Sequence, residues 1–245
     1  MVRALSGSLQ KIERANKHIA DVEARIRALP DSYVATIETN PKAGNEVIKH
    51  DLSDANTATN LALMIGDAIH NLKCALDYAW LGTIERFVPS AVTKFTKFPV
   101  YPTGGELENA LKGLKIDTAC PELFRLTICD IKPYDGGNDA IWFVHNLDIL
   151  DKHKLLIPVV TFAAIEGIEL ENDRGETARG GTWSTKQVPP YFVPIEKGWH
   201  IRNKGKVTVH VDFDRAATTL GLPVVGTLSS HSRVILKVVQ HLERL

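Results

Sequence analysis

The sequence predicts an α+β protein: a helical core with an N-terminal β-hairpin, then a mostly antiparallel β region and a C-terminal helix. Apolar residues recur at three- and four-residue spacing as far as about residue 155. From about 156 to 226, β-branched runs alternate with loops that contain Gly and Pro. Helical spacing returns over about 228–245. Because no linker-like stretch separates these parts, we expect one composite domain over residues 1–245.

The helical part begins with an amphipathic pattern that Ser6 or Ser8 caps and that Pro30 ends. Its apolar face consists of Leu9, Ile12, Ile19, Val22, Ile26 and Leu29. Two β-prone runs, 33–39 and 46–50, flank a connection that contains Pro41 and Gly44, which is typical of a hairpin. The longest helical pattern follows over about 55–87, and its apolar stripe is Leu61, Ile65, Ala68, Leu72, Ala75 and Ala79.

Shorter elements complete the prediction. Residues 98–105 read as a loop, and three further helices are expected at about 106–113, 120–130 and 138–155. The strands expected after Pro158 cover 159–164, 168–171, 182–188 and 206–213. The last helix, 228–245, carries Val234, Ile235, Val238, Val239 and Leu242 on one side.

Composition and charge exclude several classes of protein. The 29 basic residues balance the 29 acidic ones, so a dedicated nucleic-acid binder is disfavoured. Three cysteines cannot form a full disulfide framework, and the polar start of the chain does not read as a secretory signal. The longest apolar stretch, 155–165, is too short to span a bilayer. We therefore expect a reduced, cytoplasmic protein without membrane contact.

Two helical segments concentrate side chains that can do chemistry. In the first, residues 65–80, Asp67, His70, Cys74 and Asp77 follow one another at spacings of three, four and three residues, so they share one face of the helix. The second segment, residues 144–156, holds the polar or titratable residues His145, Asn146, Asp148, Asp151 and His153.

Packed side by side, the two helices would support one of two kinds of site. The first is a divalent metal site with Asp67, His70 and His153 as ligands, because Asp67 and His70 have the carboxylate-x-x-His spacing of metal sites in helical bundles. The second is a hydrolase-like or acid–base enzyme. Its predicted catalytic residues are His70, Asp77, Asp151 and His153, and its predicted contacts to a small-molecule ligand are Asn71, Lys73, Asn146 and Lys152.

A purely structural interpretation stands beside these. Lys73 and Asp77, like Asp148 and Lys152, are four residues apart and match ordinary ion pairs on a helix surface. In that case the polar segments only lock two helices together. The N-terminal amphipathic helix also suits pairing with a second copy of the chain, so the sequence is compatible with a homo-oligomer.

The chain resembles a group of uncharacterised bacterial proteins at Gly66-Asp-Ala-Ile-His-Asn-Leu-Lys-Cys-Ala-Leu-Asp77, Phe98-Pro99, Lys132-Pro-Tyr134 and Leu147-Asp-Ile-Leu-Asp-Lys-His-Lys-Leu-Leu156. A fainter similarity is to the HEPN helical domains, many of which cleave RNA with an Arg and a His four to six residues later on one helix. Lys73 and Tyr78 stand nearest to that pattern, with both residue types replaced. This resemblance implies an alternative function, an RNA- or partner-binding module with a degenerate RNase motif.

Overall fold

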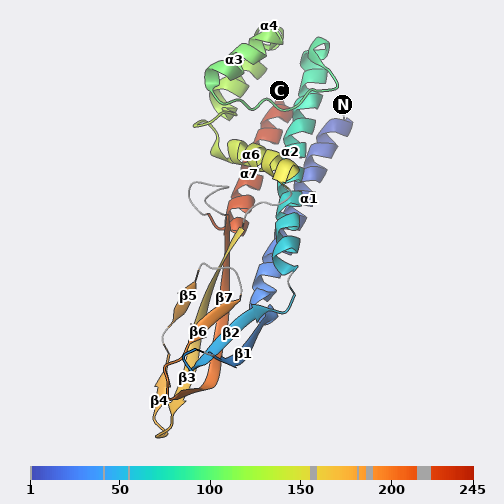
Figure 1. Ribbon diagram of the computed structural model, residues 1–245. Coiled ribbons are helices and arrows are strands. Elements are labelled where there is room, and N and C mark those ends of the chain that lie inside the picture. The colour runs from blue at the N-terminus through green and yellow to red at the C-terminus, as the bar shows by residue number, and fades with distance from the viewer. Residues whose placement is uncertain are drawn as a thin grey trace. The chain divides into compact units, whose positions relative to one another are not determined.

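The computed structural model describes residues 2–40, 42–54, 56–154, 159–180, 182–185, 190–213 and 222–245. It combines long helices with two antiparallel sheets, which confirms the predicted α+β class (Figure 1). None of the helices in the described part of the chain is both long enough and apolar enough to cross a bilayer. Predictions at Leu155, Leu156 and residues 186–188 lie outside the described residues.

The long helices are α1 (Val2–Ala28), α2 (Thr57–Phe87), α6 (Asp139–Lys154) and α7 (Val224–Arg244). The shorter helical segments are α3 (Gly104–Gly113), α4 (Ile116–Ala119), α5 (Pro121–Arg125), the π-helical turn η3 (Leu126–Ile131) and the 3₁₀ turns η1 (Leu29–Ser32) and η2 (Pro89–Ala91). Two predictions are corrected. Helix α1 begins before Ser6 and Ser8, so neither residue is its N-cap. The helix expected over 120–130 is divided between α5 and η3.

Contacts divide the chain into two compact units that interleave along the sequence. The first unit consists of Met1–Asp21, Leu63–Ile157 and Val225–Leu245. The second consists of Val22–Ala62 and Pro158–Val224. This division differs from the sequential blocks 1–155, 156–226 and 228–245 that the sequence suggested, because strands and helices pair with partners far away in the chain. That the two units form one composite domain stays a prediction.

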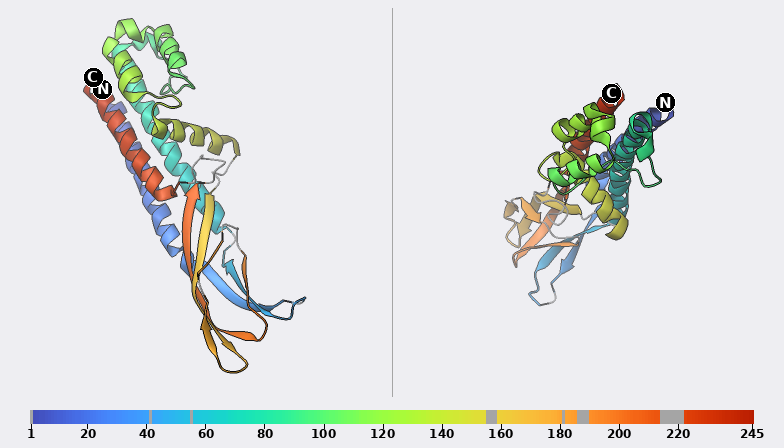
Figure 2. Two further views of the ribbon diagram at one scale, coloured as in Figure 1. Left: turned by 90° about the vertical axis from the view of Figure 1, so that its left-hand side faces the viewer. Right: turned by 90° about the horizontal axis from the view of Figure 1, so that it is seen from above.

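The first unit is helical, and α1, α2 and α7 lie side by side in it (Figures 1 and 2). The hydroxyl of Ser232 on α7 donates a 2.7 Å hydrogen bond to Oδ1 of Asn16 on α1. The predicted stripe of α2 is confirmed, since its members Ile65, Ala68, Leu72, Ala75 and Ala79 are all 0% exposed. On α1, Leu9 is instead exposed, which corrects its placement on the apolar face.

The second unit contains both sheets. One has the strand order β1 (Tyr33–Thr39), β2 (Glu46–Leu52), β6 (Tyr191–Pro194). In the other, β3 (Val159–Asn172) pairs with β4 (Thr177–Arg179), β5 (Trp183–Thr185) and β7 (Trp199–Phe213).

The predicted hairpin forms as β1 and β2, but it does not belong to the helical part. The other edge of β2 needs hydrogen-bond partners, and β6 supplies them. Three further strand predictions are corrected. The strands expected at 159–164 and 168–171 are one strand, β3; β7 begins at Trp199 rather than at 206; and β4 and β6 were not expected.

Candidate functional site

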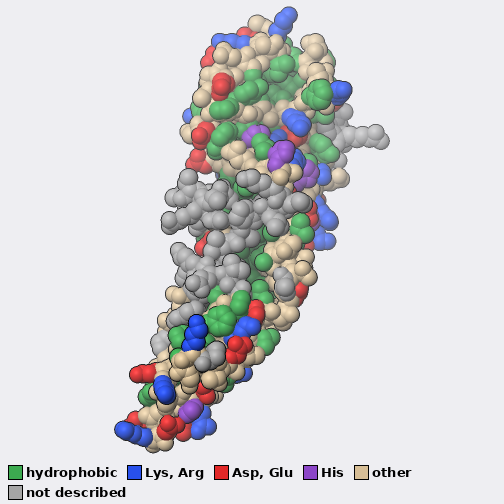
Figure 3. Space-filling view, viewed as in Figure 1, with side chains coloured by type: hydrophobic (Ala, Val, Ile, Leu, Met, Phe, Trp, Pro, Cys, Tyr) green, Lys and Arg blue, Asp and Glu red, His purple; other side chains and the backbone are tan. Residues whose placement is uncertain are grey.

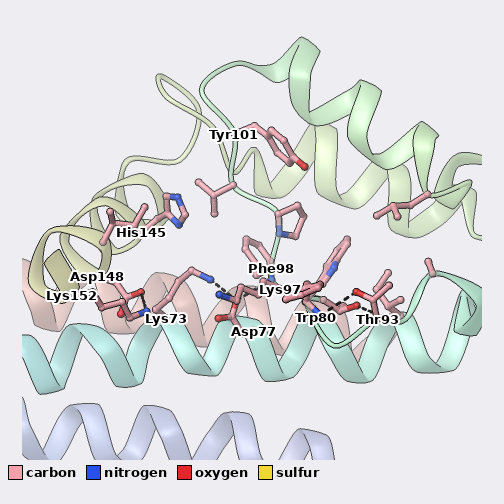
Figure 4. A pocket seen from close by; sticks show the side chains of 18 of the residues that line it. Lys73, Asp77, Trp80, Thr93, Lys97, Phe98, Tyr101, His145, Asp148 and Lys152 are labelled. Carbon is pink, nitrogen blue, oxygen red and sulfur yellow. Dashed lines mark hydrogen bonds and ion pairs between the residues drawn. The ribbon is translucent and has the colours of Figure 1, made fainter.

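The first unit holds a pocket of about 560 Å³. It is lined by α2, by the segment that connects α2 to α3, by Leu114 beyond the end of α3, and by α6 (Figure 4). Four of the residues predicted to form a site line it, namely Lys73 and Asp77 from α2 and Lys152 and His153 from α6. The structure therefore brings together part of each polar segment.

Lys73 and Asp77 form an ion pair that is not on the surface. Only 6% of the Lys73 side chain is exposed, and its ammonium contacts the Asp77 carboxylate one helical turn away. Oδ1 of Asp77 also accepts the backbone N–H of Phe98 at 2.9 Å. Asp77 thus fixes the wall of the pocket to α2, and the expectation of an ordinary surface pair was wrong for this pair.

Asp148 is a buried carboxylate with two partners that are about half exposed. Its side chain is 5% exposed, its Oδ1 lies 2.9 Å from Nδ1 of His70, and its Oδ2 accepts from the ammonium of Lys152. The sequence placed Asp148 in the polar segment and in a surface ion pair with Lys152, but not among the predicted site residues. The available signal was its position directly after Leu147, within an apolar stretch of α6.

His145 lines the same pocket as Lys73, and the two side chains point into one space from α6 and α2 (Figure 4). Nδ1 of His145 is buried and has no hydrogen-bond partner in the described part of the chain. Burial, and then the nearby charge of Lys73, lower the pKa of His145 below its ordinary value. The lowered pKa favours the neutral form of the imidazole at neutral pH. His145 was named in the polar segment but not among the predicted site residues.

The remaining walls combine aromatic rings with lysine and histidine side chains. Trp80 packs edge-on against Phe98 with ring centroids 5.7 Å apart. Lys97 and His153 also line the pocket. Histidine and lysine side chains gather on the surface over α6 (Figure 3).

The other predicted site residues lie outside the pocket lining. Asn71 donates to the backbone carbonyl of Asp67 at 2.8 Å and accepts from Lys11 at 3.3 Å, so it joins α2 to α1. Asn146 is exposed. Asp151 faces Gly66, where a Cβ would lie 2.7 Å from Asp151 Oδ1, so a glycine is needed for this close approach of α6 to α2.

The pKa of Asp151 is raised by burial and then by the charges of Asp148 and Asp67. His70 does not line the pocket. Its 2.9 Å contact with Asp148 connects it to the pocket lining.

The metal prediction gains no geometric support. Among the residues that the structure describes, no three His, Cys, Asp or Glu side chains converge on a point where a metal ion could be held. Asp67, His70 and His153 are therefore not gathered into one ligand set.

The two positions nearest to a HEPN motif are also separated. Lys73 is buried and lines the pocket, whereas Tyr78 is 44% exposed. A Cβ on Gly7 of α1 would lie 3.2 Å from the Tyr78 ring, so Tyr78 is directed towards α1. The described geometry gives Lys73 and Tyr78 no common cavity.

A comparison with protein-family models gave no match, and comparisons with curated proteins and with solved structures gave no significant match. The function is therefore inferred from the chemistry of the site.

Proposed function

We propose that the pocket binds a small molecule with an anionic group and an apolar body, and that His145 exchanges a proton with it as an acid–base group. One observation carries the proposal: a buried ammonium lines the same pocket as an imidazole whose Nδ1 has no hydrogen-bond partner among the described residues. This retains the acid–base function expected from the sequence, with His145 rather than His70 as the base in the pocket.

The charges of the lining favour an anion. Lys73, Lys97 and Lys152 face two carboxylates, Asp77 and Asp148. Both carboxylates already accept hydrogen bonds from groups of the protein itself. An incoming anion therefore meets donors rather than vacant acceptors, and it does so where water is partly excluded and charge interactions are strong.

The size and the apolar walls favour a small organic molecule over a bare ion. Ligand pockets typically measure about 300–1,000 Å³ and combine apolar walls with a few polar groups, and this pocket falls in that range. Trp80, Phe98 and Pro99 offer flat apolar surface beside the lysines. An aromatic carboxylate or phosphate ester has the matching distribution of charge and apolar area.

The proposed proton transfer follows from the protonation state of the His145 imidazole. A neutral imidazole accepts a proton as a general base and returns it as a general acid. An anion bound beside it raises its pKa, opposing the effects of burial and of Lys73. Binding of the anion is therefore expected to be accompanied by proton uptake near neutral pH.

The test is isothermal titration calorimetry with phenyl phosphate, benzoate and neutral benzyl alcohol, in buffers with different enthalpies of ionisation. We expect the two anions to bind saturably with proton uptake and the alcohol to bind far more weakly. His145→Gln should abolish the proton uptake and weaken binding about tenfold. His241→Gln, which changes an exposed histidine outside this pocket, is the matched control.

Two results would overturn the proposal. Equal affinity for benzyl alcohol would show that the lysines do not recognise charge. Proton uptake that persists in His145→Gln would assign the proton to another group.

A further inference from the structure

Three side chains of the first unit form a row that begins outside the pocket, at Cys74 and His70, and ends at Asp148 in the pocket lining. Sγ of Cys74 lies 3.4 Å from Nε2 of His70, and Nδ1 of the same ring lies 2.9 Å from Oδ1 of Asp148. Cys74 and His70 are one helical turn apart on α2, and Asp148 comes from α6. The row has the order thiol, imidazole, carboxylate, in which an activated nucleophile, its base and the group that orients the base are found in acyl-transfer sites.

The carboxylate determines which ring nitrogen of His70 can act as a base. Asp148 is buried and also receives the ammonium of Lys152, so its Oδ1 is available to His70 as an acceptor. A hydrogen bond to this oxygen requires the proton of the neutral ring to be on Nδ1. The lone pair of Nε2 is then directed at the thiol of Cys74.

We propose that Cys74 is a nucleophile, with His70 as its general base and Asp148 as the positioning residue, and that it takes the acyl group of small esters or thioesters. Sγ bonds to the carbonyl carbon while the thiol proton moves to Nε2 of His70. The bond from that carbon to the alcohol or thiol then breaks, and the leaving group takes the proton from His70. Water, deprotonated by His70, releases the acid and restores the thiol.

The surroundings of the thiol explain why it needs a base. Burial is the largest influence and raises the pKa of Cys74; Asp77 on α2 and Asp148 on α6 raise it further, while Lys11 on α1 and Lys152 on α6 lower it. Cys74 therefore rests as a neutral thiol and reacts through proton transfer to His70, as a serine hydroxyl does in a triad.

The proposed site is accessible, and Asp148 is the one member of the row that also lines the pocket. Cys74 is partly buried, and 47% of the His70 side chain is exposed. Cys74 and His70 do not line the pocket, so the proposed reaction at Cys74 does not require a ligand bound there. The chain also supplies its own comparison, because Cys129 is exposed and Cys120 is buried.

The experiment uses p-nitrophenyl acetate as the acyl donor with the full chain. Release of p-nitrophenol gives the rate, and mass spectrometry of proteolytic fragments locates the acetyl group. We expect acetylation of Cys74 to be at least about tenfold faster than that of the exposed Cys129, since general-base assistance typically contributes more than this. Cys74→Ser should remove the fast phase, and Cys129→Ser should leave it unchanged.

His70→Gln tests the base. We expect it to lower the rate at Cys74 about a hundredfold while the acetylation rate of Cys129 does not change. Rapid acetylation of Cys74 in folded His70→Gln, or an acetyl group only on Cys129, would overturn the proposal.

If His70→Gln does not fold, ¹⁵N chemical shifts of His70 in the unaltered protein provide a second test, because they show which ring nitrogen carries the proton. A protonated Nδ1 with an unprotonated Nε2 is expected. A proton on Nε2 would leave no base facing the thiol and would overturn the proposal.

Discussion

Lys73 and Asp148 are charged side chains that are almost completely buried, with 6% and 5% of each exposed. Each is paired, Lys73 with Asp77 and Asp148 with both His70 and Lys152. A buried charge is tolerated only when such partners replace its hydration, so we expect the partners to stabilise the folded protein.

Asp77→Ala tests this requirement at the residue scale. The substitution leaves the Lys73 ammonium buried without its carboxylate and removes the acceptor of the Phe98 N–H. We expect a loss of about 2–3 kcal/mol in the free energy of unfolding, below the full cost of breaking a buried pair because Asp77 is partly exposed. Urea denaturation measures it. Glu85→Ala, an exposed change on the same helix, should cost little, and equal losses in the two variants would contradict the prediction.

At the scale of elements, the pairing of β3 with β7 depends on glycines at a fixed place. Gly167 and Gly205 have φ values of +72° and +80°, a backbone region that strongly favours glycine. They lie where the register passes from Glu166↔Lys206 to Ile168↔Lys204. The two long strands therefore keep their pairing through this point because neither residue has a side chain.

Gly205→Ala is expected to destabilise the second unit. An added Cβ would lie 2.8 Å from the backbone oxygen of Glu166, and the positive φ adds strain, so we expect a loss of about 2 kcal/mol. Thermal unfolding followed by circular dichroism measures it. Gly113→Ala on α3, where a Cβ meets nothing within 4 Å, is the matched control and should not destabilise. An unchanged melting temperature in Gly205→Ala would show that the strands can shift to accommodate the methyl group.

At the scale of the whole molecule, partly buried histidines in both units make stability depend on pH. Burial lowers the pKa of His50 in the second unit and of His145 and His231 in the first. Because these pKa values are below those of the unfolded chain, the unfolded state binds more protons as the pH falls through about 6.5. The contribution of these histidines to the free energy of unfolding is therefore fully present above that pH and decreases below it.

The measurement is the free energy of unfolding by urea at about pH 7.5 and about pH 5.5, with a lower value expected at the acidic pH. The contribution of His200 to stability changes with pH in the opposite direction, because hydrogen bonds to Asp173 and Glu46 raise its pKa. Its contribution is present at low pH and is lost as the pH rises through that raised pKa. His200→Gln should therefore leave the acid loss in place, and equal stability at the two pH values would contradict the prediction.

Local patterns in the sequence were sufficient to predict where the long helices lie. The pattern over 55–87 corresponds to α2 (Thr57–Phe87), and the stripe of α2 is buried as expected, because helical hydrogen bonds and one-sided burial are both readable within a few turns. The same patterns predicted the α+β class and the hairpin. They missed β4 and β6, which are three and four residues long and are held by partners elsewhere in the chain.

For the site, the sequence alone identified the two helices that carry it and four of the residues that line the pocket, because titratable residues are concentrated there. It could not decide burial or partners. Only the tertiary structure placed Asp148 between His70 and Lys152, buried Lys73 and turned Asn146 towards solvent. It also left Nδ1 of His145 without a partner among the residues that the structure describes. These properties depend on how α6 packs against α2, and spacing along one helix specifies which residues share a face but not which neighbouring element that face meets.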